Sequence, residues 1–118
     1  MPDARTVFGA VDSKDLDAMR AMLADNARFV MGNNDPLIGK DAVMAGNAGF
    51  FTMIQGSRHA VLHEWAVGAA TIAETEVTYQ RLDGKEVTVP AVTIWEVDEA
   101  GLITNLRIYA DQTPLFAS

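Results

Sequence analysis

Residues 71–97, TIAETEVTYQRLDGKEVTVPAVTIWEV, decide the fold of this 118-residue chain. Apolar and polar side chains alternate through most of this stretch, and a period of two is typical of a strand that is buried on one face. Asp83-Gly84 interrupts the alternation and favours a tight hairpin turn, because glycine accepts the positive φ that a type I′ turn requires. We therefore predict two antiparallel strands, 71–82 and 86–97, joined by a hairpin.

The strand pattern continues on both sides of this hairpin. Residues 58–67 and 102–110 also favour strands, and the turn residues 98–101 separate the last two, which predicts a four-stranded antiparallel meander. Before residue 57 the apolar spacing is mostly helical. We expect a helix opened by Pro2 and Asp3, a second helix with its apolar repeat at 16–23 and its end near Asn26, a short strand at 27–31 and a third helix over about 40–54.

Either Asp12 or Ser13 is suited to cap the second helix, since both side chains can accept from a free backbone N–H. Helices followed by strands indicate an α+β fold. We predict a cone-shaped barrel, in which a curved antiparallel sheet packs against three N-terminal helices and encloses an interior.

Composition limits the class of protein. At 49% hydrophobic residues, we expect residues 1–118 to form a single domain with a real core. The net charge of −7 argues against nucleic acid and anionic membrane surfaces as partners, because both require clustered Lys and Arg. The chain has no cysteine, which excludes disulfides, thiolate metal sites and cysteine nucleophiles. With no membrane-spanning apolar run and no signal peptide, we expect a cytoplasmic protein.

The order of several segments resembles one superfamily. These segments are LDAMRAMLADNARFVMGN (16–33), DPLIGKDAV (35–43), SRHAVLHEW (57–65), EVTYQRLDG (76–84) and GLITNLRIYADQTPL (101–115). Together they resemble the SnoaL-like branch of the nuclear transport factor 2-like superfamily. The resemblance implies a cone-shaped α+β barrel around an apolar pocket, usually in a dimer. The superfamily includes ketosteroid isomerase, polyketide cyclases, limonene epoxide hydrolase and scytalone dehydratase, and also non-catalytic binding proteins.

The resemblance also locates the superfamily's catalytic positions in this chain. The base of ketosteroid isomerase falls at Met31, the tyrosine of its oxyanion hole at Val7 and its protonated aspartic acid at Thr93. The aspartate on the last strand of limonene epoxide hydrolase and the polyketide cyclases falls at Ile108. None of these side chains can do the original chemistry. Only the segment around His59 resembles a functional one, the stretch around a pocket histidine of scytalone dehydratase.

Two residues are candidates for acid–base catalysis. His59 is suited because the pKa of imidazole lies near neutral pH, whereas His59 and His63 lie about 13 Å apart in a strand, too far to share a metal ion. Glu76 lies two residues from Glu74, and two enclosed carboxylates repel each other, which raises the pKa of one of them and suits it to proton transfer. Alternation alone places Glu76 on a solvated face opposite Val77, whereas the match to ketosteroid isomerase places Glu76, Thr78 and Gln80 towards the cavity.

The remaining candidates form the pocket. Asn47 lies on the apolar face of the third helix, where it either anchors a ligand carbonyl or satisfies a neighbouring backbone group. The expected pocket residues are Met31, Asn47, Phe50, Thr78, Gln80, Thr93, Trp95, Leu106 and Ile108. Arg107 and Tyr109 belong to the outer sheet face, through which we expect a homodimer.

We therefore expect a pocket for a small hydrophobic ligand. As an enzyme, the protein would be an isomerase, lyase, cyclase or hydrolase that uses His59 and Glu76 and needs no cofactor or metal. The alternative is a non-catalytic binding or dimerisation module that has lost the usual catalytic residues.

Overall fold

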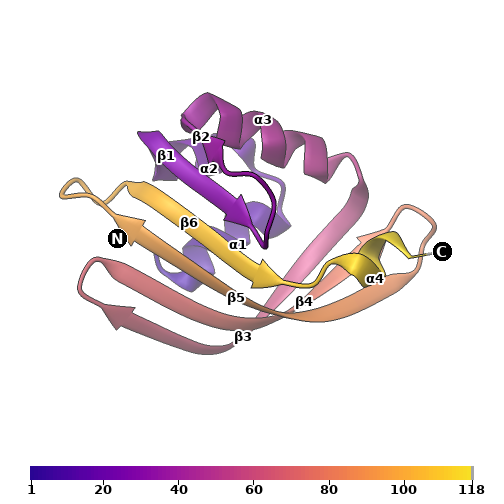
Figure 1. Ribbon diagram of the computed structural model, residues 1–118. Helices are drawn as coiled ribbons and strands as arrows, with labels where there is room; N and C mark the ends of the chain where they lie inside the picture. Colours follow the sequence, from indigo (N-terminus) through magenta and orange to yellow (C-terminus); the bar gives the residue numbers. More distant parts are fainter. Residues whose placement is uncertain (118) are drawn as a thin grey trace.

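The structure is a computed structural model and describes residues 1–117. Its elements follow the order α1 (Ala4–Asp12), α2 (Leu16–Met22), β1 (Leu23–Met31), β2 (Leu37–Ile38), α3 (Lys40–Phe51), β3 (Ile54–Val67), β4 (Ala70–Arg81), β5 (Glu86–Val97), β6 (Ile103–Ala110) and α4 (Thr113–Phe116). The α+β class is confirmed, as are the three N-terminal helices, and α4 adds a short C-terminal turn of helix (Figure 1).

The sheet has six strands in the order β2-β1-β6-β5-β4-β3. Strands β3 to β6 form the expected antiparallel meander, while β1 pairs in parallel with β6, so that Met31 lies beside Ile108. The sheet curves but does not close, because β2 and β3 at its two edges do not pair with each other (Figure 1). The cone is therefore an open one, and the helices complete its wall.

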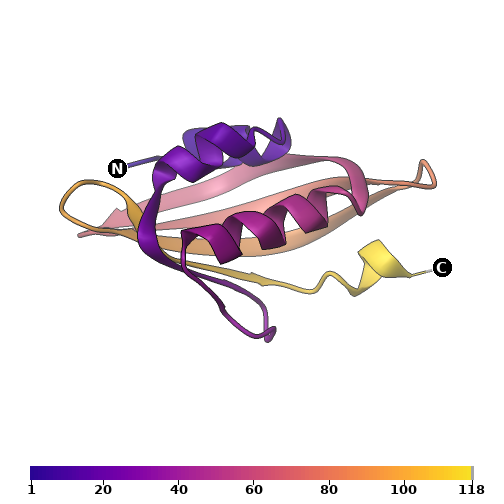
Figure 2. The same cartoon turned by 90° about the horizontal axis from the view of Figure 1, so that it is seen from above.

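The three N-terminal helices lie over the concave face of the sheet (Figure 2). Asp3 caps α1 by accepting from the Thr6 N–H. Asp15 caps α2 by accepting from the Ala18 N–H, so the expectation of Asp12 or Ser13 as this cap is wrong. Asp12 cannot cap α2 because its carboxylate accepts hydrogen bonds from Ser57 and His59 of β3.

Helices α2 and α3 both end earlier than their apolar spacing predicts. Leu23 has extended geometry and begins β1. Its apolar side chain is buried there, and a helix would bury it as well, so its position in the apolar repeat does not mark the end of the helix. At the end of α3, the Lys14 ammonium donates to the carbonyls of Phe51 and Ile54, both at 3.0 Å. This contact stabilises the point where the chain leaves the helix and enters β3.

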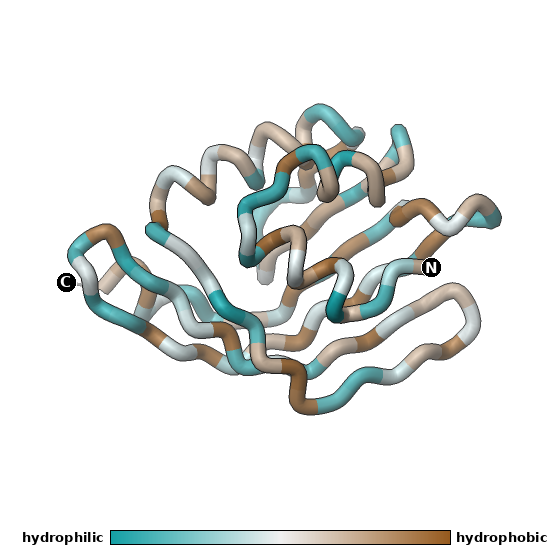
Figure 3. The backbone as a smooth tube through the Cα atoms, turned by 180° about the vertical axis from the view of Figure 1, so that it is seen from behind, coloured by the Kyte–Doolittle hydropathy of each residue, from teal (hydrophilic) through white to brown (hydrophobic). Residues whose placement is uncertain are grey.

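The core consists of two clusters. The larger joins α1, α2 and α3 to the middle of the sheet and includes Phe8, Phe51 and Trp95. The smaller lies at the α4 end and includes Tyr79 and Leu115. Hydropathy alternates along the strands in Figure 3, as expected of a sheet with one buried face.

Within residues 1–117, no helix is both long and apolar enough to cross a membrane.

Candidate functional site

A cavity of about 390 Å³ lies between the helices and the concave face of the sheet. Its wall is mostly apolar and includes Phe8 from α1, Phe50 from α3 and Leu106 from β6. A small number of polar side chains interrupt this wall: Asn34, Asp35, Asn47, Ser57, His59, Tyr79, Thr93 and Gln112. An apolar enclosure with a few polar groups is the usual composition of a small-molecule site.

Many of the residues expected at the site lie on this wall, from five different elements. They are Met31, Asn47, Phe50, His59, Thr93, Leu106 and Ile108. Asn47 Nδ2 donates to the Val43 carbonyl at 2.8 Å, one turn earlier in the same helix. Of the two roles open to Asn47, the structure therefore shows the local one, with its amide nitrogen bound to backbone.

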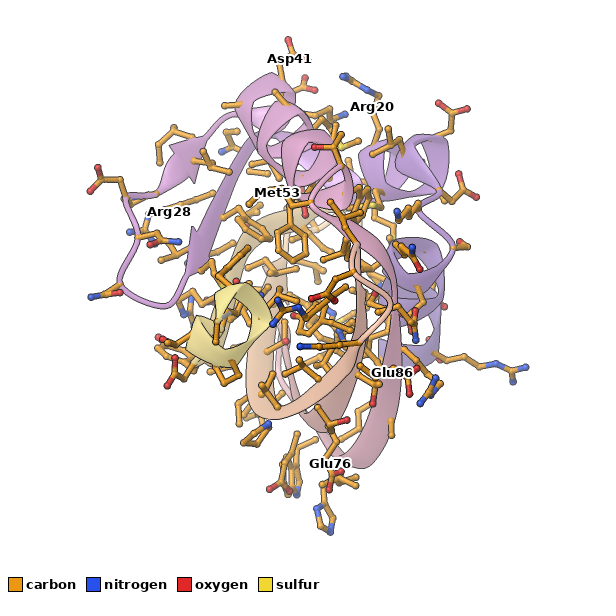
Figure 4. All side chains as sticks on the ribbon, turned by 90° about the vertical axis from the view of Figure 1, so that its right-hand side faces the viewer. Arg20, Arg28, Asp41, Met53, Glu76 and Glu86 are labelled. Atoms are coloured by element: carbon orange, nitrogen blue, oxygen red, sulfur yellow. The ribbon has the colours of Figure 1, made fainter. Side chains whose placement is uncertain are left out.

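Glu76, Thr78 and Gln80 do not line the cavity, contrary to the match with ketosteroid isomerase. Val77 and Tyr79 of the same strand are buried on the concave face, so the pleat turns their neighbours outward. Glu76 is exposed and points away from the helices in Figure 4. Two of these outward side chains form hydrogen bonds on the outer face. The hydroxyl groups of Thr78 and Thr88 are hydrogen-bonded at 2.9 Å, and the Gln80 amide donates to the Glu86 carboxylate at 3.1 Å.

Trp95 points inward as predicted but belongs to the core, not to the cavity wall. Its side chain is fully buried and packs edge-on against Phe8, with ring centroids 5.8 Å apart. The indole Nε1 donates to the Pro2 carbonyl at 3.0 Å. The indole therefore anchors the N-terminus and has no place on the cavity wall.

An irregularity in β3 separates the two histidines. The register shifts between Val61 and His63, so His59 faces inward opposite Val77 while His63 faces outward opposite Glu74. His63 Nδ1 lies 2.7 Å from Glu74 Oε1, and its ring stacks on Trp65. Only His59 is part of the cavity wall.

His59 is held by α1 on two sides. Its ring stacks on Phe8 with centroids 4.3 Å apart, and its Nδ1 lies 2.6 Å from Asp12 Oδ1. The other Asp12 oxygen accepts from the backbone N–H of His59 at 2.8 Å, and Ser57 donates to Oδ1 at 2.9 Å. Three hydrogen bonds and a stacked ring thus fix the orientation of the imidazole.

The Asp12 carboxylate also sets the chemistry of the ring. Burial raises the pKa of Asp12, but the hydrogen bonds from His59 and Ser57 outweigh burial and keep the pKa below its ordinary value. An ionised Asp12 can only accept, so the neutral imidazole has its proton on Nδ1 and a lone pair on Nε2. Nε2 has no hydrogen-bond partner among residues 1–117, and it is not among the buried polar atoms that lack one. It is therefore accessible and free to bind or deprotonate a small molecule.

Tyr79 and Gln112 form a second polar site on the wall. The Tyr79 hydroxyl accepts from Gln112 Nε2 at 3.0 Å, and the tyrosine ring packs edge-on against Phe50. Burial raises the pKa of Tyr79, the Gln112 hydrogen bond lowers it and the charge of Asp12 raises it, with a net rise. The hydroxyl is therefore neutral at physiological pH.

Sequence reasoning missed Asp12, Ser57, Tyr79 and Gln112. Asp12 follows Phe8 by one helical turn, which is the signal that it shares the inward face of α1. Alternation had already placed Tyr79 with the buried face of β4. Ser57 and Gln112 gave no signal, because both contacts depend on elements that are distant in the chain.

Within residues 1–117, no three His, Cys, Asp or Glu side chains are grouped so that they could hold a metal ion.

Solved structures with this fold are numerous, although all those compared below are distant in sequence. An NTF2-like protein of unknown function from Burkholderia pseudomallei superposes with a TM-score of 0.84 at 19% identity, covering 94% of this chain and 89% of that one. A putative SnoaL-like polyketide cyclase from a Jannaschia species has a TM-score of 0.79 at 19% identity, with coverages of 94% and 86%. An LEH-like epoxide hydrolase from M. tuberculosis has a TM-score of 0.80 at 21% identity, with coverages of 95% and 82%.

At these identities the similarity concerns the fold alone. No curated protein matches the chain by sequence. A family model described as a SnoaL-like domain matches residues 4–106, which is most of the chain. The protein therefore belongs to the SnoaL-like family and has the NTF2-like fold.

Proposed function

We propose that this protein is an acid–base enzyme that moves a proton within a small hydrophobic metabolite bound in the cavity. The observation on which the proposal depends is the Asp12–His59 pair, whose Nδ1–Oδ1 distance is 2.6 Å and which lies on the wall of an apolar cavity. At about 390 Å³, the cavity is at the small end of the roughly 300–1,000 Å³ typical of ligand sites.

In the proposed step, His59 Nε2 removes a proton from a carbon next to a carbonyl group. The C–H electron pair moves into the ligand to form an enolate, and the imidazolium is stabilised by the Asp12 carboxylate. The same nitrogen then returns the proton to a different carbon of the conjugated enolate, which is an isomerisation. Alternatively it gives the proton to a hydroxyl on the β-carbon; the C–O bond breaks, the enolate electron pair forms a C=C bond and water leaves, which is a dehydration. His59 and Asp12 also border a shallow groove between α1 and β3, through which the pair can exchange protons with solvent.

The apolar wall supports this chemistry. Met31, Phe50 and Ile108 exclude water from the ligand, and electrostatic interactions are stronger in such a medium. The proposal assigns no catalytic role to Glu76, because that carboxylate is exposed on the other face of β4.

The test is deuterium exchange on a simple ketone. Incubated in D₂O with the protein, 2-tetralone should lose the NMR signal of its α-protons faster than in buffer alone. His59→Gln should abolish the acceleration, whereas His63→Gln, in the same strand but on the outer face, should retain it. Exchange that survives in His59→Gln would refute the role of His59.

A second candidate function is ligand binding without turnover. Met31, Thr93 and Ile108 occupy cavity positions where the resemblance locates carboxylates, which favours a site that has lost catalysis. This alternative predicts that 2-tetralone binds to the wild-type protein but exchanges no faster than in buffer.

We also propose a homodimer that forms through the outer face of the sheet. Trp65, Ile72, Ile94 and Arg107 form one row across β3 to β6 on this face, and Trp65 is 48% exposed. The adjacent row has Val92 and Tyr109 together with the His63–Glu74 pair. A second copy of the chain would cover this mixed apolar and charged surface.

A further inference from the structure

The cavity has a hydrogen-bond donor that the proposed proton transfer does not yet use. Tyr79 is 6% exposed, and its hydroxyl oxygen already accepts from Gln112 Nε2. Among residues 1–117 it has no acceptor for its own proton. A buried hydroxyl normally donates as well as accepts, so a group that fills this part of the cavity should offer an acceptor.

Gln112 is held in place by the C-terminal end of the chain. It immediately precedes α4 and makes no side-chain cap to that helix, so its amide is free to reach Tyr79. Arg81 donates to the carbonyls of Pro114 and Ala117, and Leu115 packs into the cluster around Tyr79. These contacts attach α4 to β4 and thereby position the amide of Gln112.

Tyr79 lies within reach of a molecule that touches His59. Tyr79 is opposite Ser57, and His59 is two residues further along β3, so the two residues are diagonal neighbours on the concave face. Such neighbours have Cβ atoms roughly 7–8 Å apart, and both side chains line the same cavity. A carbonyl oxygen and the adjacent carbon are two bonds apart, so a single ketone group can contact both side chains.

We propose that the Tyr79 hydroxyl, positioned by Gln112, donates a hydrogen bond to a carbonyl oxygen of the ligand and thereby selects hydrophobic ketones with an acidic neighbouring C–H. This inference rests on the proposed function, since it places the reactive carbon at His59. As the proton leaves that carbon, negative charge grows on the oxygen, and the hydrogen bond from Tyr79 strengthens. Ligands that lack the oxygen would leave the Tyr79 proton without an acceptor.

The first test compares two probes that differ only in the oxygen, 2-tetralone and the hydrocarbon tetralin. Tyr79→Phe keeps the ring that packs against Phe50 and removes only the hydroxyl. It should weaken 2-tetralone binding about three- to tenfold and leave tetralin binding unchanged, as measured by calorimetry. Tyr109→Phe, which changes the exposed tyrosine of the outer face, is the matched control and should alter neither.

The second test needs no ligand. The chain has two tyrosines, so in the Tyr109→Phe background the tyrosinate absorbance reports Tyr79 alone. Gln112→Leu should raise the pKa of Tyr79, because an amide N–H that donates to the oxygen favours the phenolate. If Gln112 accepted from Tyr79 instead, the same substitution would lower the pKa, and the hydroxyl proton would not be free for a ligand.

The inference is overturned if Gln112→Leu lowers the pKa of Tyr79, or if Tyr79→Phe weakens both probes equally. These outcomes are separate from those of the proposed function. If the protein binds ketones through Tyr79 but does not accelerate deuterium exchange, the proposed enzymatic activity is refuted and the proposed hydrogen bond from Tyr79 to the ligand still holds. Thermal unfolding of each variant shows whether it remains folded.

Discussion

Asp12 accepts hydrogen bonds from three donors with two oxygens, and this arrangement defines the site at the scale of single residues. Two of the donors belong to His59, its ring and its backbone, and the third is Ser57. A carboxylate satisfies all three because it has no proton of its own. The pair is therefore sensitive both to the charge of Asp12 and to the number of its acceptor atoms.

Asp12→Asn should destabilise the protein at neutral pH. Asparagine has one acceptor oxygen, and its NH₂ group would face a donor, so at least one partly buried hydrogen bond is lost, at about 1–3 kcal/mol. Urea unfolding of the wild type and the variant measures this difference. Glu99→Gln, a substitution in the exposed β5–β6 turn, is the control and should leave stability unchanged.

The same pair predicts how stability depends on pH. The folded pKa of Asp12 lies below the 3.8 of the free side chain, so its stabilising contribution is complete above that value. The contribution is lost as the pH falls through the folded pKa and Asp12 becomes protonated. The gap in unfolding free energy between the wild type and Asp12→Asn should therefore narrow below about pH 4; a gap that widened there would contradict this assignment.

Helix α3 shows, at the scale of an element, how two similar glycines differ in their surroundings. A Cβ added at Gly46 would collide with Leu37 Cδ1, so the absence of a side chain lets β2 pack against the helix. A Cβ added at Gly49 would meet nothing within 4 Å. Only Gly46 therefore has a packing reason to be glycine.

Gly49→Ala should stabilise the protein by about 0.5–1 kcal/mol, because alanine loses less backbone entropy than glycine in a helix. A higher midpoint of thermal unfolding would show this. Gly46→Ala should stabilise the protein less than Gly49→Ala does, or should destabilise it, because the Leu37 side chain must move. Equal effects of the two substitutions would mean that the contact with Leu37 is unimportant.

At the scale of the whole molecule, the open sheet leaves two faces with different roles. Helices α1 to α3 lie over the concave face of the sheet (Figures 1 and 2). Side chains from these helices and Phe116 of α4 line the cavity on that face. Within residues 1–117 no helix covers the outer face (Figure 2), and its middle rows include Ile72 and Ile94. The proposed ligand would therefore occupy the cavity, and the proposed second copy of the chain would cover the opposite face.

Light scattering at micromolar concentration should give twice the 12.7 kDa of one chain. Ile94→Lys puts a charge in the middle of the outer face and should shift the protein towards the monomer. Leu16→Lys, on α2 and away from that face, should leave the dimer intact. A monomeric mass for the wild-type protein would contradict the proposed interface.

Much of the fold could be predicted from local pattern. Strand β5 occupies the expected residues 86–97, β4 is shifted by one residue at both ends, and β6 begins one residue later than predicted. Strand β3 begins four residues earlier than predicted, at Ile54. The parallel pairing of β1 with β6 was not predicted, because it joins segments far apart in the chain and depends on no turn.

The candidate site was less predictable. Alternation correctly favours Val77 and Tyr79 as the inward residues of β4, and the match to ketosteroid isomerase, which places Glu76 towards the cavity, is wrong for this chain. Distant sequence similarity predicts the fold more reliably than it predicts the direction in which a single side chain points.

By itself, the sequence determined the strand meander, its hairpins and the buried face of β4, because periodicity and turn chemistry are properties of neighbouring residues. Only the tertiary structure decided which polar groups meet. Asp12 reaches His59 across 47 positions, and Gln112 reaches Tyr79 across 33. The register shift in β3 turned His59 inward and His63 outward. Such contacts depend on how helices and strands pack together, and no local pattern in the sequence encodes that packing.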